Sequence, residues 1–219
     1  MKEFLPILRK CTLFEGIRQE DLLPMLGCLG AKLGRFQKGQ VIFFEGEEAK
    51  CFGIVLSGSV QIVNEDFHGN RTIVSRAGEA ELFCESFACA GVKILPVSAV
   101  AAEDSVVAFI DSRRICFSCS NACAFHSRTM QNLLKVVSER NLQFHQKMEI
   151  TAKRTTREKL MSYLLAQAKE AGSDSFTIPY DRQELADYLQ VERSAMSAEI
   201  SKLRADGILE SKRNHFRIL

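Results

Sequence analysis

The sequence predicts an α+β fold: an N-terminal antiparallel β-roll (a cupin-like jelly roll), one long helix, and a small C-terminal domain of helices and a hairpin. Three observations predict it. Short segments rich in β-branched and aromatic residues recur between 36 and about 112. Apolar residues then recur at helical spacing to 149, and a new series of capped helices follows. The expected domains are 1–115, 116–150 and 151–219.

Composition agrees with a folded chain and excludes several classes of protein. The 219 residues are 46% hydrophobic and 26% charged, with a net charge of +2, so bulk charge does not identify a partner. The start of the chain lacks the features of a signal peptide, and Glu103 and Asp104 interrupt the longest mostly apolar stretch, 97–110. We therefore expect a soluble cytoplasmic protein that crosses no membrane. Its eight cysteines are then expected to be reduced thiols, metal ligands or redox groups rather than a disulfide framework.

The first elements alternate apolar clusters, strands and glycines. Residues 1–35 hold short apolar clusters, and Asp21 is a candidate helix cap. Glycines recur among the expected strands at intervals that suit the turns of a small antiparallel roll. The expected strands are 41–44, 52–56, 60–63, 72–74 and 106–110, and the glycines are Gly39, Gly46, Gly58, Gly69 and Gly78.

The stretch 116–149 is expected to be one helix with an apolar stripe. Met130, Leu133, Val137 and Phe144 lie close to a heptad seam, which favours a parallel homodimer. The alternative is that the stripe packs against the roll of its own chain.

The C-terminal domain opens on a capping-box pattern at 155–158, and the helix that follows is expected to stop at Gly172. A strand at 176–178, a helix capped by Asp181, and a turn at 190–192 come next. A helix over 193–206 and a hairpin complete a winged helix-turn-helix.

Apolar and polar residues separate on the second helix of this motif. Met196, Ile200 and Leu203 share one face and must point inward. The opposite face is short and polar and carries one arginine in the first turn, which suits entry into a DNA major groove. The candidate base-reading residues are Arg193, Ser194 and Ser197, and the candidate backbone contacts are Ser201, Lys202, Lys212 and Arg213. The alternative is a merely solvated helix face.

The glycines of the roll, the long central helix and the segments Arg182-Gln-Glu-Leu-Ala-Asp-Tyr-Leu189 and Arg193-Ser-Ala-Met-Ser197 resemble the Crp/Fnr family of bacterial transcription regulators. The resemblance covers nearly the whole chain. It implies an effector-binding roll, a dimerisation helix, a reader of palindromic double-stranded DNA, and RNA polymerase as a further partner. The chain departs from the two best-known members at Ser194 and Ala198, where they have glutamate and arginine, so the operator sequence should differ from theirs. Gln190 replaces a frequent turn glycine.

The resemblance places an effector pocket at Gly78, Glu79, Leu82, Phe83, Val97 and Ser98. Relatives that bind cyclic nucleotides hold the phosphate with a Gly-Glu-Leu/Phe-Gly segment and an arginine. This chain has Gly78-Glu-Ala-Glu81 and no lysine or arginine between Lys93 and Arg113. Because a buried phosphate without a cation is strongly disfavoured, we do not expect cyclic AMP as the ligand. Another small molecule remains open, and Lys93 is an alternative cation.

Cys116, Cys119 and Cys123 lie close together in the sequence, with His126 three residues beyond. On a single helix they would extend too far along the axis for one zinc ion to gather them all. Three interpretations stay open: packing as small apolar residues, a redox thiol pair, and a metal or iron–sulfur cluster. For His126, packing or hydrogen bonding is the preferred interpretation.

The function predicted from these features is a dimeric, sequence-specific DNA-binding regulator controlled by an unidentified small-molecule or redox signal. The alternative is a ligand-binding regulatory module whose winged domain contacts protein. No P-loop, nucleophile elbow or metalloprotease motif is present, so we do not expect an enzyme.

Overall fold

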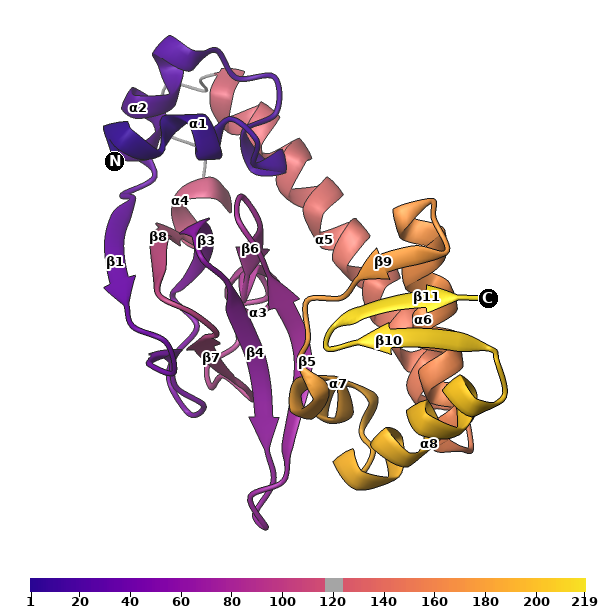
Figure 1. The fold of residues 1–219 in the computed structure, drawn as a ribbon. Helices are drawn as coiled ribbons and strands as arrows, with labels where there is room; N and C mark the ends of the chain where they lie inside the picture. The colour runs from indigo at the N-terminus through magenta and orange to yellow at the C-terminus, as the bar shows by residue number, and fades with distance from the viewer. Residues whose placement is uncertain (117–123) are drawn as a thin grey trace. The chain divides into compact units, whose positions relative to one another are not determined.

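The computed structural model describes residues 1–116 and 124–219 (Figure 1). The chain forms two compact units, Met1–Asn141 and Leu142–Leu219, and each is described by itself. Within the described residues, no helix combines the length and the apolar character needed to cross a bilayer.

The N-terminal unit begins with short helices that cover a core. They are η1 (Lys2–Phe4), α1 (Leu5–Leu8), η2 (Thr12–Phe14) and α2 (Gln19–Cys28). The N-cap of α2 is Arg18 rather than Asp21, which lies in the first turn and accepts a 2.7 Å hydrogen bond from Arg18 Nε. The expectation that Asp21 caps the helix is therefore wrong. The carboxylate still lies at the helix N-terminus, where negative charge is favourable.

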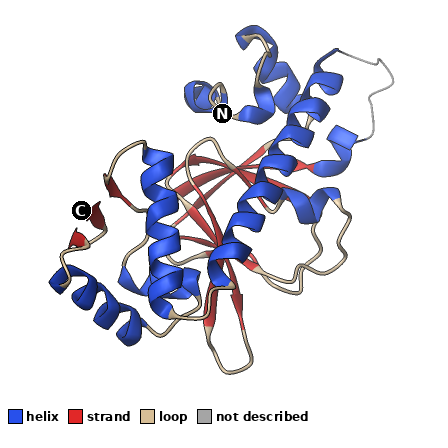
Figure 2. Ribbon diagram, turned by 90° about the vertical axis from the view of Figure 1, so that its right-hand side faces the viewer, coloured by secondary structure: helices blue, strands red, loops and turns tan. Residues whose placement is uncertain are grey.

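Two four-stranded antiparallel sheets form the roll, in the orders β1-β8-β3-β6 and β2-β7-β4-β5. Figure 2 shows the strands of the roll crossing one another at its centre. The strands are β1 (Lys32–Phe36), β2 (Val41–Phe43), β3 (Cys51–Ser57), β4 (Val60–Glu65), β5 (Arg71–Ala77), β6 (Leu82–Phe83), β7 (Ser98–Ala101) and β8 (Ser105–Asp111).

Each of the five expected strands is present, whereas β1, β6 and β7 have no counterpart in the sequence prediction. These three are short, and β1 carries lysine, glycine and arginine. Their pairing with distant strands, rather than local propensity, makes them strands.

The interior of the roll is filled by side chains from both sheets, phenylalanines above all. The ring of Phe43 lies 5.7 Å from Phe83 and 5.5 Å from Phe109, and Phe36 packs edge-on against Phe109 at 6.1 Å. A Cβ at Gly53 would overlap the Phe83 ring, so glycine at this position lets the ring lie directly on β3. These aromatic side chains are part of the packed core of the roll.

A second core lies on the other face of the β1-β8-β3-β6 sheet, where β3 and β8 pack with α1, α2 and the first half of α5 (Ala124–Thr151). Two short helices, α3 (Glu85–Cys89) and α4 (Ser112–Cys116), flank the sheet. The long helix is therefore present over 124–151. Its expected extension through 117–123 lies outside the described residues.

The structure corrects the expected position of Leu133 on the α5 stripe. Leu133 is 6% exposed and belongs to the core of its own unit, together with Val136. For these two residues the alternative interpretation, packing against the chain's own roll, is the right one. The neighbouring Leu134 is 69% exposed, so it takes the place on the outer face that Leu133 was expected to hold.

The C-terminal unit follows the expected order closely. It contains α6 (Thr156–Ala171), β9 (Ser175–Thr177), α7 (Arg182–Leu189), α8 (Arg193–Ala205), β10 (Leu209–Lys212) and β11 (His215–Ile218). Capping boxes at Thr155/Glu158 and Asp181/Glu184 start α6 and α7, as their spacing predicts. The three strands form a sheet in the order β10-β11-β9.

Candidate nucleic-acid interface

Helix α8 separates its faces as the sequence predicts. Met196, Ile200 and Leu203 are at most 5% exposed and fix the helix to its unit. The opposite face is open to solvent and carries the three candidate base-reading residues, with Ala198 and Ser201 beside them: Arg193, Ser194 and Ser197 are all exposed. The buried stripe therefore presents this polar face outward.

Arg193 is the first residue of α8, directly after the N-cap Glu192. Within the described residues of the C-terminal unit, no side chain or carbonyl holds its guanidinium. An arginine at this position opposes the helix dipole, so it contributes little to helix stability. A free guanidinium at the start of an exposed helix can take up the fork geometry that guanine O6 and N7 accept.

Two of the candidate backbone contacts already have local partners. Ser201 Oγ donates a 3.1 Å hydrogen bond to the Ser197 carbonyl, and Lys202 Nζ pairs with Glu199 Oε1 at 2.7 Å. The Lys202 side chain is 64% exposed and that of Glu199 is 19% exposed, so the ammonium group stays open to solvent and can also reach a phosphate.

The hairpin β10–β11 has a two-residue tip. Lys212 pairs with His215, and Arg213 between them has a φ of 55°, which an arginine adopts only at some cost. Asn214 anchors the tip, because its Nδ2 donates to the Ile178 carbonyl at 3.1 Å and its own carbonyl accepts from Ile178 N at 2.9 Å. The anchored tip leaves Lys212 and Arg213 exposed, as a wing that contacts DNA phosphate requires.

The structure adds Arg182 to this surface, a residue that the sequence analysis used only as part of a motif. Its guanidinium lies 4.7 Å above the Phe216 ring, and Nη2 donates to Ser211 Oγ at 3.3 Å. Nη1 is buried and has no hydrogen-bond partner among the described residues. Burial, with a contribution from Arg204, lowers the pKa of Arg182. Arginine as the first residue of a helix, against the helix dipole, was the available signal.

The six expected effector-pocket residues differ in their surroundings. Leu82 packs in the core under the helices, whereas Phe83 and Val97 belong to the aromatic interior of the roll. Glu79 is exposed, and Ser98 Oγ accepts a 3.0 Å hydrogen bond from Glu45 N. Neighbouring residues of a strand face opposite sides of a sheet, which is why Leu82 and Phe83 separate. Leu82 therefore faces the core under the helices, and the effector pocket built from these six residues stays a prediction.

The glycine segment before β6 carries its own carboxylate. Gly78 N donates a 3.0 Å hydrogen bond to Glu81 Oε2, and Ala80 has a φ of 66°. The backbone N–H of Gly78 thus already donates to the Glu81 carboxylate, in the segment where the resemblance places a phosphate.

A buried ion pair ties the same region to α5. Glu85, 2% exposed, lies 3.5 Å from Arg140 Nε, and Arg140 Nη2 donates to the Leu82 carbonyl at 2.9 Å. Removing one partner of such a pair leaves an uncompensated buried charge. Sequence spacing gave no signal for this pair, because its residues are 55 positions apart.

The cysteines of the described region differ in exposure and in the pKa of their thiols. Burial raises the pKa of Cys11 and of Cys84 to about 12, which makes both thiols poor nucleophiles. Cys28 is exposed. Cys116 ends α4, while Cys119 and Cys123 lie outside the described residues. Across the part of the chain that the structure describes, no three His, Cys, Asp or Glu side chains are grouped for a metal ion. His126 is buried.

Comparison with known proteins agrees with this architecture. A model of the cyclic nucleotide-binding domain matches residues 33–115, and a model of the Crp-like helix-turn-helix domain matches residues 158–219. The transcriptional activator protein FnrA of Stutzerimonas stutzeri is 23% identical over 194 residues, which cover 86% of this chain and 77% of FnrA.

Solved structures share the fold. The c-di-GMP-responsive global regulator CLP of Xanthomonas campestris has a TM-score of 0.75 at 19% identity, covering 92% of this chain and 99% of CLP. A CooA mutant of Carboxydothermus hydrogenoformans has a TM-score of 0.70 at 17% identity, covering 90% of each chain. FixK2 of Bradyrhizobium japonicum has a TM-score of 0.66 at 20% identity, covering 86% of this chain and 92% of FixK2.

The two matched domains, their order along the chain and the sorted faces of α8 lead to one conclusion: this chain belongs to the Crp/Fnr family of transcription regulators, with a domain of the cyclic nucleotide-binding type and a helix-turn-helix DNA-binding domain.

Proposed function

We propose that the chain acts as a homodimer that reads a palindromic operator with α8 and the β10–β11 wing, under control of a small-molecule or redox signal sensed in the roll. The observation that carries the proposal is the exposed α8 face, with Arg193 free at its first residue and Lys212 and Arg213 exposed on the adjacent hairpin. This combination supplies one fork for a base and several cations for the backbone.

The outer face of α5 supports dimerisation. Its residues alternate at spacings of four and three, as the a and d positions of a coiled coil do: Met130, Leu134, Val137, Asn141, Phe144 and Met148. Val137 is half-buried and also packs against the core of its own unit. Leu134 and Met148 are 69% and 60% exposed, which is unusual for large apolar side chains spaced in this way. A polar Asn141 at one a position favours a single register in a parallel pair.

Oligomeric state tests this surface with a matched pair of variants. Leu134→Glu places like charges opposite each other across the seam and should give a folded monomer by light scattering. Leu133→Glu buries a charge in the core of its own unit and should instead unfold that unit. A dimer that persists in Leu134→Glu would remove the proposed seam.

We propose that the signal is not a cyclic nucleotide. Phenylalanines fill the interior of the roll, Glu81 already accepts from Gly78 N, and residues 94–112 supply no cation. These residues do not fit a buried cyclic phosphate. Calorimetry with cyclic AMP should show no binding in the micromolar range, and saturable micromolar binding would overturn this part of the proposal.

The proposed DNA reading is tested by selection from a random DNA pool. The wild-type chain should enrich a two-fold motif with half-sites about one helical turn apart. Arg193→Ala should lose about 1–3 kcal/mol on that site and relax one base pair in each half-site. Lys212→Ala should weaken binding to every sequence about equally and lower the salt slope by about one unit.

Three results would contradict the reading model: a pool without a two-fold motif, an Arg193→Ala variant that selects the wild-type motif, and binding that does not depend on salt. Salt-independent binding to a protein partner would support the winged domain as a protein-contact module instead. Because FnrA is named a transcriptional activator, we further propose RNA polymerase as a partner.

A further inference from the structure

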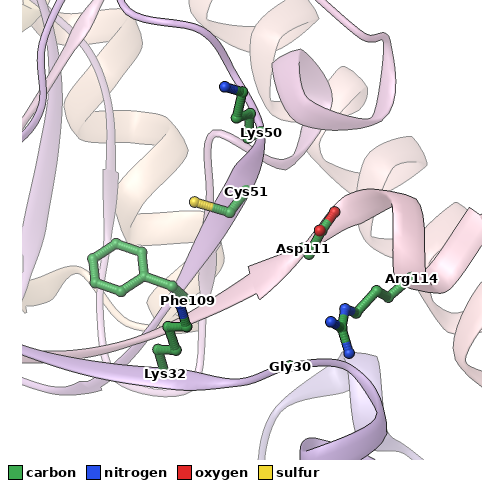
Figure 3. Close-up of a pocket in the computed structure, with 7 residues that line it drawn as sticks. All are labelled: Gly30, Lys32, Lys50, Cys51, Phe109, Asp111 and Arg114. Atoms are coloured by element: carbon green, nitrogen blue, oxygen red, sulfur yellow. The ribbon is translucent and has the colours of Figure 1, made fainter.

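A pocket of about 220 Å³ opens on the N-terminal unit, apart from the expected effector residues (Figure 3). Seven residues line it: Gly30, Lys32, Lys50, Cys51, Phe109, Asp111 and Arg114. They come from β1, β3, β8 and α4 and from the residues beside these elements, so the pocket exists only when the roll is assembled.

Strand register brings these residues to one face of the sheet. Lys32 pairs with Phe109, and Cys51 pairs with Asp111. Side chains two positions apart on a strand share a face, so all four lie on the face that also carries the aromatic interior. The pocket is thus the end of the roll interior, at the point where the phenylalanines stop and charged residues begin.

The lining is rich in cations. Lys32 and Arg114 are exposed, and Lys32 has no hydrogen-bond or ion-pair partner among the described residues of its unit. Arg114 Nη1 donates to the Cys28 carbonyl at 3.1 Å, which fixes the guanidinium beside Gly30. A Cβ on Gly30 would lie 3.1 Å from Arg114 Cζ, and its φ of 65° suits glycine.

Lys50 completes the set of cations. It pairs with Glu48 at 2.8 Å through side chains that are about 60% exposed, as their values of 61% and 59% show. An exposed pair of this kind is weak, so Lys50 can turn to a ligand at little cost.

The Asp111 carboxylate in the pocket pairs with Arg113, which is not one of the lining residues. Arg113 donates to Asp111 Oδ1 from Nε at 3.1 Å and to Oδ2 from Nη2 at 2.9 Å. These bonds lower the pKa of Asp111, so the group stays an anion paired with Arg113. Asp111 is the one anion among the seven lining residues, so the three lining cations Lys32, Lys50 and Arg114 outnumber it.

The floor of the pocket is neutral. Phe109 contributes an aromatic ring, and burial, together with the nearby Asp111, raises the pKa of the Cys51 thiol, so Cys51 carries no charge at neutral pH. Three cations around a small neutral floor favour an anion with several oxygen acceptors over a bare halide. The volume of about 220 Å³ lies below the roughly 300–1,000 Å³ of pockets for drug-sized ligands, which favours a small ligand.

We propose that this pocket binds a small oxyanion with two negative charges, a phosphate or a short dicarboxylate, held between Lys32, Lys50 and Arg114. As a binding site the pocket stands independently of DNA reading. As the effector site of the regulator it rests on the proposed function. Arg114 lies on α4, between the roll and α5 in the chain, so a ligand that engages it acts on the segment that leads to the proposed dimer helix.

Calorimetry on the full chain in a zwitterionic buffer tests the site, with inorganic phosphate and succinate as separate probes and chloride as the comparison anion. At least one of the two dianions should bind saturably with one site per chain. Lys32→Gln and Arg114→Gln should each weaken that binding at least about tenfold, because each removes one charge-assisted contact. The probe that binds more tightly, phosphate or succinate, shows which of the two anion classes the pocket prefers.

Two control variants locate the bound anion. Lys10→Gln removes an exposed lysine of the same unit, and Lys212→Gln removes a cation of the wing; both should bind the dianion as the wild type does. Loss of binding in Lys212→Gln but not in Lys32→Gln would place the anion on the DNA-reading surface and overturn the proposal. Equal binding of chloride, or no saturable binding of either dianion, would also overturn it. DNA selection with Lys32→Gln keeps this test separate, because the operator motif itself should not change.

Discussion

The two units of this protein bring their candidate functional side chains together in different ways. In the C-terminal unit the candidate DNA-contacting residues are exposed on α8 and the β10–β11 hairpin, between Arg193 and Arg213 in the chain. In the N-terminal unit the cations of the pocket are brought together by strand pairs such as Lys32 with Phe109, which are 77 positions apart. Periodicity and capping in the sequence are therefore enough to locate a surface on one helix. A pocket depends instead on the register between distant strands.

The residue types divide in the same way. All eight cysteines lie at or before position 123, and the three tyrosines lie at 163, 180 and 188. In the C-terminal unit the tyrosines form one cluster, with Tyr188 4.9 Å from Tyr180 and Lys147 Nζ 4.3 Å above the Tyr188 ring. Because the chain has no tryptophan, tyrosine fluorescence reports on the C-terminal unit, and thiol chemistry reports on the N-terminal region.

The largest expected effect concerns the aromatic interior of the roll. Phe83→Ala should destabilise the N-terminal unit by about 3–5 kcal/mol, because it leaves a cavity beside Gly53 in the buried interior of the roll. Chemical denaturation followed by circular dichroism should show the loss, while the midpoint from tyrosine fluorescence stays in place. Phe67→Ala is the control, since Phe67 is 92% exposed and should change stability by less than about 0.5 kcal/mol. An equal shift of the tyrosine midpoint in Phe83→Ala would break the contrast between the units.

The second prediction concerns the buried thiols. In the folded chain the pKa of Cys11 and of Cys84 is about 12, above the ordinary value of 9.0. Between these values the unfolded chain loses a proton that the folded chain keeps, so the free energy of unfolding falls as pH rises from 9 to 12. The expected loss is about 1 kcal/mol for each thiol between pH 9 and 10.

Denaturation of Cys11→Ala and Cys84→Ala at pH 8 and pH 10 measures this term, because each variant should lose less stability over that interval than the wild type does. Labelling of the native chain by a thiol reagent should reach the exposed Cys28 before either buried thiol. Fast labelling of Cys11 in the native state would contradict its assignment to the core.

The smallest expected effect concerns a single backbone angle in the C-terminal unit. Gln190 ends α7 with a φ of 54°, in the left-handed region that favours glycine. Gln190→Gly should stabilise this unit by about 0.5–1 kcal/mol, because the side chain no longer opposes the turn. Its backbone carbonyl, which accepts from Lys159 Nζ at 3.4 Å, is retained.

Gly172→Ala is the matched control at the end of α6, where φ is 62° and nothing lies within 4 Å of an added Cβ. It should destabilise the unit by about 1 kcal/mol through backbone strain alone. Thermal unfolding followed by tyrosine fluorescence compares the two variants. Equal effects of the same sign would show that the left-handed geometry does not control the stability of these helix ends.

The order of the elements in the C-terminal unit, and the face of α8 that points outward, could be predicted from the sequence. Met196, Ile200 and Leu203 recur at helical spacing, and Asp181 with Glu184 marks the start of α7; both signals act within a few residues of chain. The absence of lysine and arginine from 94–112 was equally readable without a structure.

Only the tertiary structure decided which residues on a strand or helix meet partners from elsewhere. It placed Leu133 inward and Leu134 outward, separated Leu82 from Phe83, and paired Glu85 with Arg140. A one-residue difference changes the face of a strand and rotates a helix position by about 100°. Spacings of three and four residues in the sequence do not decide which of two adjacent residues is buried. The packing of distant strands against α5 decides it.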